Sequence, residues 1–525
     1  MNRVQEKGAS AAGLHWMQIL FLLAVIGNYV TEAIQAEDDA IVEFSIFEGM
    51  TEVRVPCRVH LRNREGRSVR PKNLKSQSLP WFHDHFCCPG TASLQIPAGD
   101  YHYEIERGPE YAVVIGDFSV RSGERLNVRS ELNRLIDMKQ EGWWSGETHV
   151  HRPLRDVPLL MQAEDLQLAV VITWWNENNL WDQQPLPSPP VMITNEGRVI
   201  DQMGGEDERG GGALLFSGLQ SPLPIQKARR ESPASNSFLR AGKKLSAWVD
   251  AEKPFWWDFP VWLSTGMVDS VGIANNHMCR SEMYPGKEAW GHPRDLNEFP
   301  EPLGNGYWTQ SIYYHALNAG FRIPPSAGSA SGVLPNPVGY NRMYVRADGE
   351  LTLEKWWSAV RSGQVFVTNG PLLRVTANAQ HPGHVFQSEG PVELTIDGRI
   401  DSRDAIRSLE LVHDGRIQRL ERFPTTLELS DSGWFLIRAV ADVDSTFRFA
   451  STGPWYVEIA KPGQSVQKNS CDFFRRWTGE RIDCLRQTLI SSEDREMVLP
   501  EFEAAQEFWE KRAGAAMPVD RQHTD

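Results

Sequence analysis

The sequence predicts a mixed α/β chain in which a central domain of parallel strands is flanked by two β-domains. Three observations lead to this prediction. Short apolar runs separated by turns fill residues 37–135, and the same pattern returns over residues 373–462. Between these regions, apolar runs alternate with helix-like segments, which is typical of a parallel sheet or barrel. The chain has 525 residues, which is room for about three or four domains.

Residues 1–36 have the pattern of a cleaved export signal. Arg3 and Lys7 make a positive start, the apolar run 17–26 follows, and small residues lead up to Ala36. This run is too short to cross a bilayer comfortably, which favours cleavage over anchoring. The sequence therefore predicts an exported protein, periplasmic or extracellular, with no stable membrane anchor after the signal is removed.

The N-terminal domain, residues 37–135, is expected to be an antiparallel β-sandwich. Its strand-like runs include 41–47, 92–96 and 111–115, and the turn residues 97–100 separate two of them. Six cysteines suit an oxidising compartment. Cys57 with Cys87 or Cys88 is one possible bridge and Cys471 with Cys484 is another, but a sequence does not fix connectivity.

The central domain, residues 136–372, alternates strands and helices. Strands are expected at 168–173 and 268–274, helices at 157–166 and 309–318, and polar, Pro-rich surface loops at 183–190 and 222–244. A second β-domain is expected over residues 373–462, with strands such as 392–396, 409–412 and 434–440. Residues 463–525 are expected to form an amphipathic helical tail.

The charge balance limits the choice of partner. With 54 basic and 68 acidic residues the formal charge is −14, which argues against nucleic acid or an anionic membrane. A small molecule or a glycan is the expected substrate, and the sequence does not settle the oligomeric state.

Two histidines two residues apart are the strongest sign of chemistry. His149 and His151 lie at the end of the first strand expected in the central domain, where alternation points both imidazoles to one face. His277 also follows an apolar run, and Glu206 lies in an acidic, Gly-rich segment expected to be a loop after another strand. Strand ends of this kind collect ligands in α/β folds. The four residues are a workable ligand set for Zn, Mn or Fe.

This domain resembles the PHP (polymerase and histidinol phosphatase) superfamily, in particular its CehA/McbA-like metallohydrolases. Residues 146–151 correspond to the family's opening Gly-Asp-Leu-His-x-His, and residues 319–329, 336–345 and 365–373 match its closing segments. The similarity covers roughly residues 140–375. It implies a distorted (β/α)7 barrel that binds divalent metals and hydrolyses phosphoesters or other esters.

The sequence also departs from the family. Trp174-Trp175-Asn176 stands where the family has Asp-His-Asn, residues 328–332 lack the closing Asp and His, and Lys253-Pro254 replaces a His-Pro. The resemblance therefore implies one ion at most, or none. Trp174, Trp175 and Asn176 are expected instead to bind substrate at the barrel mouth, where indoles stack on a sugar or an aromatic ester.

The sequence is compatible with three functions. The first is an exported metal-dependent hydrolase with a reduced metal site, whose general base is not identified, with Glu147 and Asp165 as nearby candidates. The alternative is a non-catalytic extracellular glycan-binding protein on a decayed PHP barrel. A glycosidase ranks last, because no carboxylate pair stands out. A second His-x-His, His83 and His85, has no carboxylate-rich loop beside it and is expected to cover a sheet edge or face the neighbouring domain.

Overall fold

A computed structural model describes residues 39–285, 291–460, 463 and 465–516. The chain is a mixed α/β protein in which strands outnumber helices, so the predicted fold class is confirmed at this level. The expected export signal, residues 1–36, lies outside the described residues. Among the residues that are described, no helix combines the length and the apolar character needed to cross a bilayer.

The N-terminal region contains two sheets around one apolar core. One sheet contains, in spatial order, β5 (Thr91–Ile96), β1 (Ala40–Glu48) and β8 (Arg125–Leu132). The other contains β3 (Trp81–Phe82), β4 (His85–Cys88), β2 (Cys57–Asn63), β6 (Gly99–Glu106) and β7 (Val114–Val120). Alternate residues of β1 are buried, as a strand with one core face requires. The pairing is antiparallel except between β1 and β8, which run parallel.

Six strands of the central region run in the same direction and belong to a closed barrel. These are β9 (Trp143–Val150), β10 (Leu168–Trp175), β13 (Val199–Arg209), β15 (Trp248–Ala251), β16 (Ser270–Ala274) and β17 (Pro325–Ala327). Antiparallel neighbours are β11 (Asn178–Asn179), β12 (Val191–Ile193), β14 (Gly212–Ser217) and β18 (Arg342–Arg346). The helices between them are α2 (Val157–Ala163), α3 (Asn236–Lys244), α4 (Phe259–Ser264), α5 (Gly304–Asn318) and α6 (Leu353–Arg361).

One sequence prediction for this region is wrong. Residues 222–244 were expected to be a surface loop, but their second half is helix α3. Phe238, Leu239 and Gly242 are buried on one face of this helix, and Gly242 packs against the ring of Phe216. The amphipathic pattern of this helix is short and directly follows a Pro- and Ser-rich segment, so the composition of the whole stretch resembles that of a loop.

The C-terminal strands belong to two sheets, and most of them continue the barrel sheet. They are β19 (Val365–Thr368), β20 (Leu372–Ala377), β21 (Val385–Ser388), β22 (Val392–Asp401), β23 (Ile406–His413), β24 (Arg416–Leu420), β25 (Thr425–Leu429), β26 (Gly433–Ala441), β27 (Phe449–Thr452) and β28 (Trp455–Ile459). β19 pairs with β18 on one side and with β27 on the other, so hydrogen bonds join the two regions. β20, β22 and β25 form a separate three-stranded sheet.

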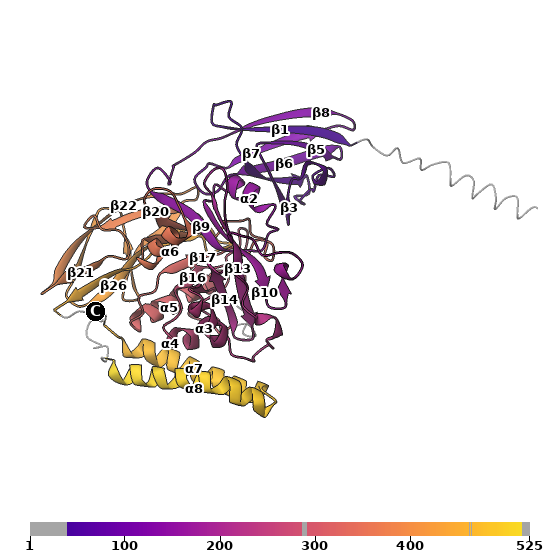
Figure 1. The fold of residues 1–525 in the computed structure, drawn as a ribbon. Coiled ribbons are helices and arrows are strands. Elements are labelled where there is room, and N and C mark those ends of the chain that lie inside the picture. Colours follow the sequence, from indigo (N-terminus) through magenta and orange to yellow (C-terminus); the bar gives the residue numbers. More distant parts are fainter. Residues whose placement is uncertain (1–38, 286–290, 461–462, 464, 517–525) are drawn as a thin grey trace, which may run out of the picture.

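The expected helical tail is a hairpin of α7 (Lys468–Thr488) and α8 (Ser492–Ala515). Figure 1 shows it along the helical side of the barrel, at the opposite end of the molecule from the N-terminal sheets. The Trp509 indole donates a hydrogen bond to the carbonyl of Pro260 in α4 at 3.0 Å. The Arg481 guanidinium is paired with Asp258 at 2.8 Å, so buried polar contacts as well as apolar ones hold the tail in place.

The cysteines carry free thiols. Cys57 and Cys88 are cross-strand partners on β2 and β4, with their sulfurs 3.7 Å apart. Cys471 and Cys484 both lie on helix α7, where a separation of 13 residues corresponds to about 20 Å along the axis. A bridge between these two is therefore ruled out by the helix.

Candidate metal centre

The end of strand β9 brings two imidazoles together with one carboxylate. His149 and His151 point to the same face, and the Glu206 side chain reaches them from β13. The Nε2 atoms of the two histidines are 2.9 Å apart, and Glu206 Oε2 lies 3.2 Å from His149 Nε2 and 3.1 Å from His151 Nε2. One ligand atom from each residue therefore lies close to the other two, an arrangement that can hold a metal ion.

These distances match a coordination polyhedron. Ligands at about 2.0 Å from a tetrahedral zinc are separated by about 3.3 Å from one another. All three separations between Nε2, Nε2 and Oε2 are within a few tenths of an ångström of that value. The side chains are held in this arrangement by burial, since His149 and Glu206 are 1% and 2% exposed.

Glu206 occupies a strand and not the expected loop. It lies inside β13 and pairs with Trp175 of β10. Two glycines precede it because the neighbouring strand approaches closely: a Cβ on Gly205 would lie 1.8 Å from the Trp174 ring, and one on Gly204 would lie 2.6 Å from the carbonyl oxygen of Val171. The Gly-rich composition therefore indicates close packing in a strand, which the sequence alone does not distinguish from a loop.

A second carboxylate supports the centre from outside. Glu252 directly follows β15, and its Oε1 lies 3.3 Å from His149 Nδ1, the ring nitrogen that faces away from Glu206. The Lys253 ammonium contacts the other oxygen of Glu252, and the Trp256 indole donates to it at 3.3 Å. Carboxylates in this position orient a metal-binding imidazole and raise its basicity. Sequence reasoning missed Glu252, although the end of an expected parallel strand could have indicated it.

The electrostatics of this centre favour a cation among the three side chains. Burial opposes the charged form of His149, but Glu206 and Glu252 outweigh burial and raise its pKa to about 10. Burial also works against ionised Glu206, yet the two imidazoles hold its pKa well below the usual range. Burial, together with repulsion from Glu206, raises the pKa of Glu208 to about 7.

The structure does not bring His277 into the three-residue group. Its ring lies among Phe255, Trp256 and Tyr284, with centroid distances of 5.4, 6.4 and 6.1 Å. Burial, followed by the charge of Lys253, lowers the pKa of His277 to about 3, so the ring is neutral. His277 is therefore a buried, neutral ring that packs among aromatic side chains near Lys253.

The three residues expected to bind substrate have different positions. Trp174 is 2% exposed and stacks on Phe216 in the barrel core, so it does not line the site. Asn176 has a positive φ of 51°, and its side chain accepts a hydrogen bond from the Glu208 backbone N–H, which makes it a turn residue. Trp175 packs edge-on against His151 at 4.9 Å, and its buried indole nitrogen has no hydrogen-bond partner.

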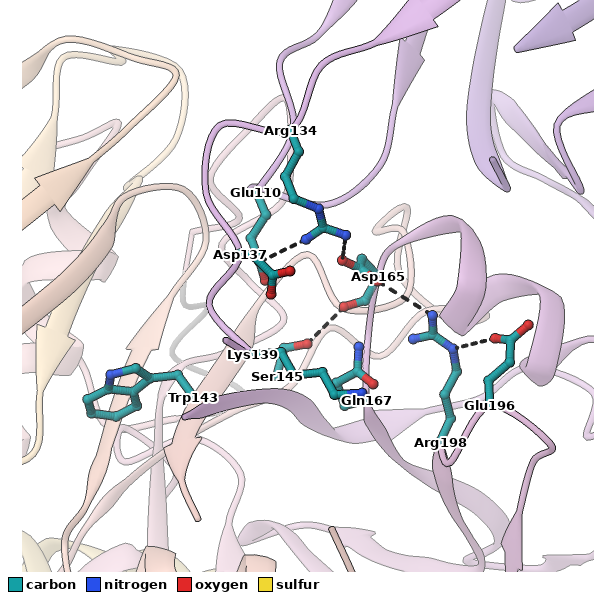
Figure 2. A pocket seen from close by; sticks show the side chains of 10 residues that line it. All are labelled: Glu110, Arg134, Asp137, Lys139, Trp143, Ser145, Asp165, Gln167, Glu196 and Arg198. Carbon is teal, nitrogen blue, oxygen red and sulfur yellow. Dashed lines mark hydrogen bonds and ion pairs between the residues drawn. The ribbon is translucent and has the colours of Figure 1, made fainter. Parts of the chain in front are cut away.

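Neither nearby carboxylate suggested as a general base reaches the site. Glu147 is fully buried and accepts hydrogen bonds from the backbone N–H groups of Ser329 and Gly339, both at 2.7 Å. Asp165 lies at the other end of the strands, beside a cavity of about 200 Å³. Figure 2 shows its carboxylate paired with Arg134 and Arg198, so ion pairs line this cavity.

Comparison with known proteins adds little. No model of a known protein family matches the chain, and no curated protein matches it. Among solved structures, "The Bacillus anthracis TIE protein" aligns over 23% of this chain and 20% of that chain, with 15% sequence identity and a TM-score of 0.15. The chain thus spans about a fifth of that protein, and a likeness this low does not bear on fold or function.

Proposed function

We propose that the protein is an exported metal-dependent hydrolase of the PHP, CehA/McbA-like type, with one divalent ion held by His149, His151 and Glu206. The observation that carries the proposal is the mutual distance of 2.9 to 3.2 Å between their three ligand atoms. Zn, Mn and Fe all accept such a set of nitrogen and oxygen ligands.

The distorted (β/α)7 barrel of that family is part of the proposal. It is supported by six strands with one direction, by helices in their connections, and by the position of the site at the strands' carboxyl ends. The motif-like residues 146–151 and 319–329 point the same way.

A divalent ion in this position would polarise an ester oxygen and lower the pKa of a bound water to about 7. The chain's own residues have separate tasks. Glu252 lies 3.3 Å from His149 Nδ1 and holds the ring with Nε2 directed at the centre, and Lys253 balances the charge of Glu252. Trp175 packs edge-on against His151 and limits the movement of that imidazole.

Glu208 is the residue placed to move a proton. It lies two residues after Glu206 on β13, so both carboxyls project from one face of the strand. Glu208→Gln is therefore expected to reduce kcat by about 10²–10⁴-fold, the usual contribution of a general acid–base. The metal content of this variant should equal that of the wild type, which separates proton transfer from ligation.

The proposal is tested by elemental analysis of the purified mature protein, together with hydrolysis assays on panels of phosphoesters and carboxyl esters. We expect one equivalent of a divalent metal that is lost in the His149→Ala/His151→Ala variant, along with any hydrolysis. A wild-type protein that binds no metal at this site and hydrolyses none of these esters would overturn the proposal. Glycan binding that survives chelation would then favour the glycan-binding alternative, whose stacking argument is weakened by the burial of Trp174.

A further inference from the structure

A second convergence of ligand-type side chains lies in the N-terminal sheet, apart from the site proposed above. His60 on β2 and His85 on β4 are directly opposite each other in the antiparallel register. Side chains in such cross-strand pairs leave the sheet on the same face, with Cβ atoms about 5 Å apart. Asp84, in the turn between β3 and β4, adds a carboxylate to the two rings, whose centroids are 5.2 Å apart.

The three side chains have the spacing of metal ligands. Asp84 Oδ2 lies 3.1 Å from His60 Nδ1, and Asp84 Oδ1 lies 3.2 Å from His85 Nδ1. One ligand atom from each residue is within 4.8 Å of the other two. His60 and His85 are 1% and 2% exposed, so the two rings have little freedom to turn away.

The two carboxylates around His60 leave one of its ring nitrogens without a suitable partner. Nδ1 faces Asp84, whereas Nε2 is buried without a hydrogen bond and faces Glu106 Oε1 at 3.9 Å. A neutral imidazole carries one N–H and one lone pair, so one carboxylate must face a lone pair. A cation shared by Nδ1 and Asp84 removes this conflict, because the proton then stays on Nε2 and points to Glu106, the outer carboxylate that metal-binding histidines usually have.

The charged neighbours of the group are themselves paired. Arg58 and Arg280 are bound to Glu106, Arg58 at 2.8 Å and Arg280 at 2.6 Å, and Arg62 donates to Asp84 at 3.2 Å. These guanidinium groups are therefore already bound to carboxylates.

We propose that His60, Asp84 and His85 bind a second divalent cation with the ligand preference of Zn²⁺, which fastens the β3–β4 hairpin to β2. The hairpin borders the site proposed above, since the guanidinium of Arg152, the residue after His151, lies 4.6 Å from the ring centroid of Phe82. The role of the ion is structural, so this site neither requires nor implies hydrolysis.

The two centres can be counted separately by titrating the metal-free full-length protein with Co²⁺ and following the visible absorption of the bound ion. Wild type should saturate at two equivalents, and the His149→Ala/His151→Ala variant at one. The His60→Gln/His85→Gln variant should also lose one equivalent, and its melting temperature should rise less than that of the wild type on addition of Zn²⁺, because only the His149 site is left to bind it. His83→Asn is the matched control: His83 is exposed and has a φ of 50°, which Asn tolerates, so two equivalents should remain.

Saturation of wild type at one equivalent, with none left in the His149→Ala/His151→Ala variant, would overturn the second site and leave the proposed hydrolase intact. One equivalent that persists in that variant and disappears from His60→Gln/His85→Gln would support the second site even if no ester is hydrolysed. Asp84→Asn serves if the double variant fails to fold, because the amide preserves the shape of the turn. Unchanged Co²⁺ stoichiometry in a folded Asp84→Asn protein would contradict the proposal.

Discussion

At the scale of single residues, the candidate metal centre depends on groups that do not touch the ion. His149 has one nitrogen for the centre and one for Glu252, and Glu252 in turn is held by Lys253 and Trp256. This chain of contacts fixes which nitrogen carries the proton. Substitution of Glu252 should therefore weaken metal binding almost as much as substitution of a ligand does.

Glu252→Gln is expected to weaken metal binding by about 10–100-fold, the usual effect of removing an outer carboxylate. The amide keeps the size of the side chain but loses the charge that raises the basicity of His149. Competition with a chromophoric chelator measures the change. Glu196→Gln is the control, because Glu196 pairs with Arg198 at the far end of the strands and should leave affinity unchanged. Equal affinity in the two variants would show that Glu252 does not orient His149.

At the scale of elements, the sequence predicts what depends on local periodicity and misses what depends on register. The shared face of His149 and His151 follows from strand alternation within three residues. The pairing of His60 with His85 depends on the register of β2 against β4, which no local pattern encodes. Asp84 was overlooked for the same reason: it lies between two histidines in sequence, but its partner ring comes from another strand.

The contact between β10 and β13 gives a packing prediction. Gly205→Ala would place a methyl group inside the Trp174 ring, so the indole must move and the protein should lose about 1–3 kcal/mol of stability. Urea denaturation followed by circular dichroism measures this loss. Gly479→Ala is the control: it lies inside α7 with no close neighbour beyond Gln506 Oε1 at 3.9 Å, and should gain about 0.5–1 kcal/mol. A Gly205→Ala protein as stable as wild type would mean that β10 and β13 are not so closely packed.

His315 on α5 should make the free energy of unfolding sensitive to acid, because helix α7 packs against its ring. This ring stacks on Phe473 at 4.2 Å and bonds to Ser470, and burial lowers its pKa to about 4. The unfolded chain binds a proton near pH 6.5, so stability falls as the pH drops from 6.5 towards 4. The loss is at most about 3 kcal/mol for a shift of this size. Urea denaturation of wild type and His315→Gln at pH 7.5 and pH 4.5 should show a smaller acid-induced loss in the variant, and equal losses would exclude His315 as the cause.

At the scale of the whole molecule, the barrel and the C-terminal strands are joined through both their hydrogen bonds and their core. β19 is paired on one side with β18 and on the other with β27. The second apolar cluster also mixes the two regions, because Tyr344 stacks on Phe366 at 5.0 Å in a core shared with Phe435 and Trp455. A boundary near residue 372, which the change of sequence pattern predicts, therefore does not coincide with a gap in the packing.

Truncation tests this continuity. A protein that ends at residue 372 loses β27 and leaves β19 as an unpaired edge above an exposed core, so we expect it to aggregate or to lack a cooperative thermal transition. A protein that ends at residue 460 keeps both partners of β19. Of the described helices and strands, it loses α7 and α8. It should remain folded by near-ultraviolet circular dichroism, with a lower melting temperature, because the hydrogen bonds of Trp477 to Trp257 and of Trp509 to Pro260 in α4 are lost. A soluble, cooperatively melting 39–372 protein would show instead that the barrel folds alone, and that the shared sheet is a docking contact between two independent units.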